Sequence, residues 1–142
     1  MRALLDVNVL IALLDVDHIA HGSAQRWMAA HGECGWATCP LIQNGCLRIM
    51  SRRGYSNPFS IPDIIRRLRA TVQHPLHSFW PDEVSLLDRA LFDETRLLGP
   101  AQLTDAYLLA LAVSRQGRLV TFDRRITTSA VIGARPEHLV VI

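Results

Sequence analysis

Two aspartates each come directly after a short apolar segment. Asp6 follows residues 3–5, and Asp123 follows residues 118–122. A carboxylate at the end of a buried strand is costly unless a cation or hydrogen bonds compensate its charge. Ligands of an open parallel sheet bind just outside the carboxyl ends of its strands. If both segments are parallel strands of one sheet, Asp6 and Asp123 meet at the edge where a ligand would sit.

Asp105, in the first turn of an expected helix, is a third candidate. Each acid also has a structural explanation, because Asp6 or Asn8 could simply cap the next helix and Asp105 could interact favourably with its helix dipole. Together, however, three carboxylates repel one another unless a cation joins them. Carboxylate oxygens and water select Mg²⁺ or Mn²⁺, which can activate water for attack on a phosphodiester. A metal site is our hypothesis for the three acids.

These acids must be positioned by an alternation of strands and helices. We expect strands at residues 3–5, 34–39, 77–81, 118–123 and 138–142. We expect helices at residues 7–14, 18–31, 40–52, from about 62, at 83–97 and at 103–117, the last capped by Thr104. Such alternation predicts an α/β fold with a mainly parallel sheet.

Length and composition predict one domain that spans residues 1–142. The chain is 49% hydrophobic, which is enough for a substantial core. It shows neither a secretory signal pattern nor an apolar run long enough to cross a membrane, so we expect a cytoplasmic protein. Its three cysteines include no CxxC pair, and we expect reduced thiols rather than disulfides or a zinc site.

The charge distribution is uneven although the formal net charge is only +2. Residues 48–69 carry six arginines against a single acid, Asp63. This basic segment is either a nucleic-acid or acidic-partner surface or an ordinary solvated helix face. All fifteen basic residues are arginine, so any chemistry that requires lysine is excluded.

Five sequence blocks, in order and spread over nearly the whole chain, resemble a known family. They are LLDVNVLIALL, the H-x-x-A-x-x-W pattern from His21 to Trp27, ATCPLIQNGCLRI, LTDAYLLALA and LVTFD. Together they resemble PIN-domain proteins, and more narrowly the VapC-like ribonuclease toxins of bacterial type II toxin–antitoxin pairs.

The resemblance implies a single-domain, three-layer α/β/α sandwich around a mainly parallel five-stranded sheet. It also implies a Mg²⁺- or Mn²⁺-dependent endoribonuclease that hydrolyses RNA, forms a homodimer and binds a small cognate antitoxin. The metal-binding aspartates of the family match Asp6, Asp105 and Asp123. Its supporting polar residues match Asn8, Thr104 and Thr121.

One position departs from the family pattern. The glutamate expected in the central block is Gln43, which we expect at the catalytic pocket but outside the metal's inner ligands. An amide cannot supply negative charge or act as a general base. The alternative function is therefore a catalytically weakened PIN module that binds RNA or a partner without cleaving. Arg48, Arg52 and Arg53 are the candidates for RNA or partner contact.

A different enzyme class is disfavoured by the same sequence. Phosphatases and receivers that form an aspartyl phosphate also place an aspartate after a strand, but they rely on a lysine near the phosphate. This chain contains no lysine.

Overall fold

The computed structural model describes residues 1–142 and is built around one five-stranded sheet in the order β3-β2-β1-β4-β5. The strands are β1 (Ala3–Leu5), β2 (Trp36–Thr38), β3 (His77–Phe79), β4 (Arg118–Thr121) and β5 (Leu139–Val141). Every neighbouring pair is parallel. The predicted α/β class is confirmed, and the sheet is wholly rather than mainly parallel.

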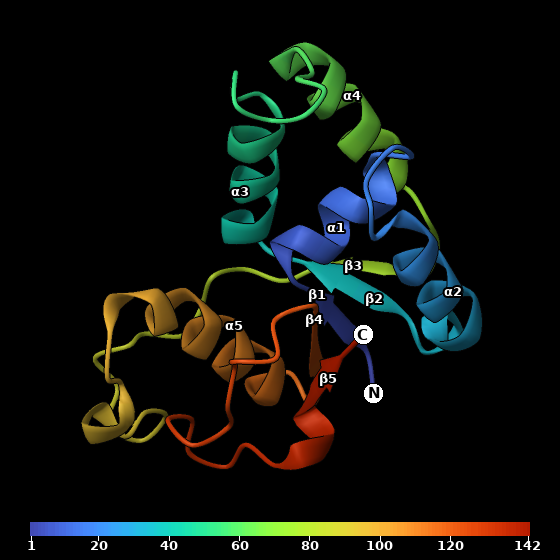
Figure 1. The fold of residues 1–142 in the computed structure, drawn as a ribbon. Helices are drawn as coiled ribbons and strands as arrows, with labels where there is room; N and C mark the ends of the chain where they lie inside the picture. Colours follow the sequence, from blue (N-terminus) through green and yellow to red (C-terminus); the bar gives the residue numbers. More distant parts are fainter.

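Helices cover both faces of this sheet (Figure 1). They are α1 (Val7–Leu14), α2 (His21–His31), α3 (Pro40–Met50), α4 (Ile61–Thr71) and α5 (Leu103–Ser114). The first four gather on one side of the sheet and α5 lies on the other, which gives the expected three layers. None of the helices has both the length and the hydrophobicity that crossing a bilayer requires.

The centre of the core is the junction of β1 and α1. All three residues of β1 are buried, as expected for a central strand of a parallel sheet that is covered on both faces. Leu10 and Ile11 of α1 are also almost fully buried. Asp6 therefore connects two elements that have little freedom to move, and its carboxylate is held in a fixed place.

The predicted helix at 83–97 is wrong. This stretch is irregular apart from one 3₁₀ turn at Glu94–Arg96 and an isolated antiparallel bridge between Phe92 and Val131. Side chains compete with the helical hydrogen bonds, since Ser85 Oγ accepts the Leu87 N–H and Asp88 Oδ1 accepts the Ala90 N–H. Leu87 is 92% exposed whereas Phe92 is buried in the core, so the apolar residues of this stretch reach the core from an irregular chain rather than from one face of a helix.

One predicted helix start and one predicted N-cap also need correction. The second helix begins at His21 rather than residue 18, because the preceding segment forms turns in which Asp15 accepts the Asp17 N–H and His18 accepts the Ala20 N–H. Helix α5 begins at Leu103 after a 3₁₀ turn at Pro100–Gln102, so its N-cap is Gln102 rather than Thr104.

Gly117 allows the chain to turn from α5 into β4. A Cβ atom at this position would lie 2.7 Å from the Arg2 carbonyl oxygen and 2.7 Å from the Trp80 ring. The backbone oxygen cannot move away without disturbing β1, because the Arg118 N–H donates to it at 3.0 Å. Gly117 therefore helps to set how β4 lies against β1.

We expect Gly117→Ala to lower the free energy of unfolding by about 1–3 kcal/mol, because the added methyl group overpacks a closely fitted contact. Gly54→Ala is the matched control, since a Cβ atom there meets nothing within 4 Å. Urea denaturation of both variants measures the difference. Equal stability of the two variants would contradict the packing argument.

Candidate active site

Asp6 lies at the carboxyl end of β1 and is 6% exposed. Its carboxylate caps α1 by accepting the Val7 N–H at 2.6 Å. Its other oxygen, Oδ2, accepts a hydrogen bond from Thr121 Oγ1 at 2.7 Å. Burial raises the pKa of Asp6, although both hydrogen bonds favour the charged form, and the nearby charge of Asp123 raises it further. Asp6 is thus both the helix cap and a buried carboxylate whose charge is only partly compensated.

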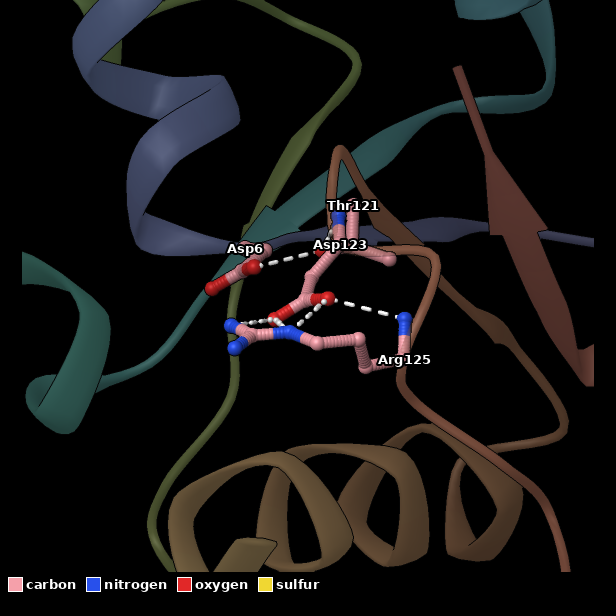
Figure 2. Close-up of polar contacts among 4 residues, drawn as sticks. All are labelled: Asp6, Thr121, Asp123 and Arg125. Carbon is pink, nitrogen blue, oxygen red and sulfur yellow. Dashed lines mark hydrogen bonds and ion pairs between the residues drawn. The ribbon is translucent and has the colours of Figure 1, made fainter. Parts of the chain in front are cut away.

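Thr121 connects Asp6 to Asp123 (Figure 2). The same hydroxyl oxygen that donates to Asp6 accepts the backbone N–H of Asp123 at 3.0 Å. The connection is possible because β1 and β4 are parallel neighbours in which Leu5 lies opposite Val120. The two strands therefore end together, and the two aspartates lie at one edge of the sheet.

Asp123 forms an ion pair that the sequence analysis did not anticipate. Three N–H groups of Arg125 donate to it: the backbone N to Oδ1 at 2.8 Å, Nε to Oδ1 at 2.9 Å and to Oδ2 at 3.3 Å, and Nη2 to Oδ2 at 2.7 Å. These contacts lower the pKa of Asp123 to about 2. A basic residue two positions after a candidate ligand was the available signal, because such a spacing lets a turn fold the guanidinium back.

Asp105 approaches the same place from the other face of the sheet. It lies in the first turn of α5 and is partly buried. Burial, together with the negative charges of Asp6 and Asp123, raises its pKa to about 6, while Arg125 acts in the opposite direction. The three aspartates therefore lie close enough to influence one another's ionisation.

A small cavity of about 150 Å³ opens beside two of these acids. Its lining includes Asp105 and Asp123 together with two cations, Arg96 and Arg125. Apolar side chains such as Ile126 complete the wall. Carboxylates beside guanidinium groups suit a ligand that carries both a cation and an anionic oxygen, such as a metal ion with a phosphate.

The carboxylate oxygens of Asp6, Asp105 and Asp123 are suitable ligands for a hard divalent cation, although the three side chains are not arranged around a common point. No three His, Cys, Asp or Glu side chains lie close enough to hold a metal ion as they stand. The guanidinium group of Arg125 instead forms an ion pair with the carboxylate of Asp123. A cation is thus already accommodated at this edge, and the available oxygens are of the kind that Mg²⁺ and Mn²⁺ prefer.

Gln43 lies apart from the aspartates. Its amide donates to Thr38 Oγ1 at 3.0 Å, and that hydroxyl lies 2.9 Å from His77 Nε2. It borders a groove between α3 and α4 rather than the cavity beside Asp105. The structure therefore shows Gln43 in a network at the end of β2, with no hydrogen bond to any of the three acids.

Of the other predicted site residues, only Thr121 contacts the acids. Thr121 contacts the acids as described, whereas Asn8 and Thr104 are exposed and form no side-chain hydrogen bonds, so the support expected from them is absent. The three arginines proposed for RNA or partner contact, Arg48, Arg52 and Arg53, are exposed and do not line the cavity.

Sequence comparison relates the whole chain to known proteins. A sequence model of the PIN domain matches residues 3–131. Ribonuclease VapC44 of Mycobacterium tuberculosis is 49% identical over 142 residues, which cover all of both chains. Ribonuclease VapC39 of the same species is 42% identical over 134 residues, covering 94% of this chain and 96% of the relative.

Solved structures share the fold at low sequence identity. The crystal structure of VapC20 from M. tuberculosis, a toxin that cleaves the sarcin–ricin loop, has a TM-score of 0.62 at 16% identity and covers 94% of this chain and 99% of that one. VapBC2 from Rickettsia felis, bound to a DNA fragment from its promoter, has a TM-score of 0.60 at 12% identity and covers 100% and 98%. The fold, the PIN-domain match and the full-length relatives agree, and this chain belongs to the VapC-like branch of the PIN-domain family.

Proposed function

We propose that the chain is a metal-dependent endoribonuclease and the toxin of a toxin–antitoxin pair, with residues 1–142 as its nuclease domain. The observations that carry the proposal are that Thr121 joins Asp6 to Asp123 at the carboxyl ends of β1 and β4, and that Asp105 and Asp123 line one cavity. The full-length similarity to Ribonuclease VapC44 supports RNA as the substrate class.

In this proposal the three aspartates hold Mg²⁺ or Mn²⁺. When bound, the cation supplies Lewis acidity that activates a water molecule and neutralises charge on the phosphate. Thr121 keeps the Asp6 carboxylate oriented through its 2.7 Å hydrogen bond. Arg96, in the cavity wall, is placed to bind the phosphodiester as an anion. Hydrolysis then forms one bond from water oxygen to phosphorus and breaks one phosphorus–oxygen bond of the RNA backbone, whose leaving oxygen takes a proton.

The proposal also covers partners and location. The likeness to the VapBC2 structure supports a small antitoxin as the inhibitor, and we propose a homodimer that acts in the bacterial cytoplasm. The exposed Arg48, Arg52 and Arg53 are candidates for contact with RNA or the antitoxin.

A non-cleaving PIN module that binds RNA or a partner is the second candidate. It is favoured by Gln43, which brings no negative charge and is bonded to Thr38 instead of the acids. RNA cleavage that appears with Mn²⁺ or Mg²⁺ and disappears with a chelator would support the enzyme. RNA binding without cleavage under all these conditions would support the module.

Asp6→Asn is expected to abolish growth arrest and to reduce RNA cleavage at least about 100-fold, because the site loses a charged oxygen ligand. Asparagine also caps helices well, so the variant should stay folded. Asp17→Asn is the control, since Asp17 is an exposed acid outside the site. Growth arrest by the Asp6 variant as strong as that of wild type, at equal expression, would refute the assignment.

The raised pKa of Asp105 predicts a pH dependence of metal binding. Because this carboxyl titrates at about 6 in the metal-free protein, Mn²⁺ affinity should fall as the pH drops through 6. Calorimetric titrations of the protein with Mn²⁺, repeated at steps of about one pH unit between pH 5 and 8, would measure this change in affinity. Affinity that is constant across this range would show that Asp105 is not a ligand.

The same shift predicts that Asp105 costs stability in the metal-free protein. A carboxyl whose pKa is raised by folding destabilises the native state above that pKa, and this cost disappears below the unfolded value of 3.8. Asp105→Asn should therefore raise the free energy of unfolding by about 1 kcal/mol at pH 7.5, after allowance for solvent screening. The gain should vanish near the unfolded pKa; a gain independent of pH would rule out this electrostatic origin.

A further inference from the structure

Arg125 occupies the acidic edge in the way that a bound cation would. Its guanidinium spans both oxygens of Asp123, with Nε at 2.9 Å from Oδ1 and Nη2 at 2.7 Å from Oδ2. Figure 2 shows this guanidinium beside the Asp123 carboxylate, on the side that faces α5. The charge of Asp105 also acts on Arg125 and raises its pKa. One arginine thus offsets part of the charge of the acid cluster.

The local turn explains how Arg125 reaches Asp123. Thr121 Oγ1 accepts the Asp123 N–H, and Asp123 Oδ1 accepts the Arg125 N–H at 2.8 Å. These two bonds fold the chain back immediately after β4 and direct the arginine toward the carboxylate. Its position is therefore a product of sequence neighbours and does not depend on distant packing.

Little besides the carboxylate holds the arginine in place. The Arg125 side chain is 90% exposed, whereas the Asp123 side chain is 27% exposed. All the hydrogen bonds that the guanidinium donates go to Asp123. An exposed arginine held by a single ion pair can leave at small cost, because solvent and salt replace the lost interaction.

We infer that Arg125 is an internal competitor for the divalent cation, which must displace the guanidinium from Asp123 in order to bind. The inference rests on the proposed metal site. Both oxygens of Asp123 already accept hydrogen bonds from Arg125, and a metal ion beside a guanidinium would meet a like charge at short range. The arginine therefore stabilises the metal-free acids and at the same time lowers the affinity for metal.

Neighbouring arginines do not share this position. Arg124 is exposed and forms no ion pair. Arg96 lines the same cavity, but its Nε is paired with Asp93 Oδ2 at 3.2 Å. Arg124 therefore provides a matched control, because its removal changes the net charge equally without freeing Asp123.

Calorimetric titration of the purified metal-free protein with Mn²⁺ tests the inference. Arg125→Ala should bind Mn²⁺ about fivefold more tightly than wild type, the upper range for the loss of an exposed ion pair. Arg124→Ala should change the affinity less than about twofold, as expected for a screened surface charge.

The outcomes separate this inference from the proposed function. Equal tightening by Arg124→Ala, or unchanged affinity in Arg125→Ala while Asp6→Asn abolishes binding, would overturn the competition and leave the metal site intact. Absence of saturable Mn²⁺ binding in wild type and in Arg125→Ala would overturn the metal site and, with it, the competition.

Discussion

The buried hydrogen bond from Thr121 to Asp6 is the interaction on which the site depends. It joins the ends of two parallel strands, β1 and β4, through the side chain of Asp6, a residue that is only 6% exposed. A buried carboxylate without such a donor is strongly unfavourable, so the bond allows Asp6 to remain at this position. Because the same hydroxyl also accepts the Asp123 N–H, one side chain sets the relative position of two acids.

Bringing three acids together costs stability, and the structure shows how the cost is distributed. Asp123 keeps its charge through Arg125 and has a pKa of about 2, whereas Asp105 has no such partner and a pKa of about 6. Burial is the main cause of the raised pKa of Asp105, and the negative charges of Asp6 and Asp123, which raise it further, also attract a cation to the edge. Functional sites commonly lower the stability of the protein that carries them, and the raised pKa of Asp105 is such a cost.

The parts of the site that could be predicted from sequence are those fixed by local rules. Asp6 and Asp123 follow apolar strands, and parallel pairing brings such ends together. Asp105 could be named as a candidate from the sequence, but its position near the other two acids could not be predicted from spacing, since it depends on the irregular path before α5. That path, where a helix was predicted at 83–97, is governed by side-chain-to-backbone bonds that hydrophobic periodicity does not reveal. The contact of Arg125 with Asp123 was not predicted, because it arises from a turn rather than from a sequence motif. The position of Gln43 was not predicted either, because its hydrogen bond to Thr38 is a contact between side chains that sequence spacing does not specify.

The central claim is that Asp6, Asp105 and Asp123 form one divalent cation site. Anomalous diffraction from crystals of the protein grown with saturating Mn²⁺ would test it most directly. The account predicts an anomalous peak within bonding distance of carboxylate oxygens from this group, with the Arg125 guanidinium moved off Asp123. A structure with no such peak, in which Arg125 still pairs with Asp123 at saturating Mn²⁺, would contradict it.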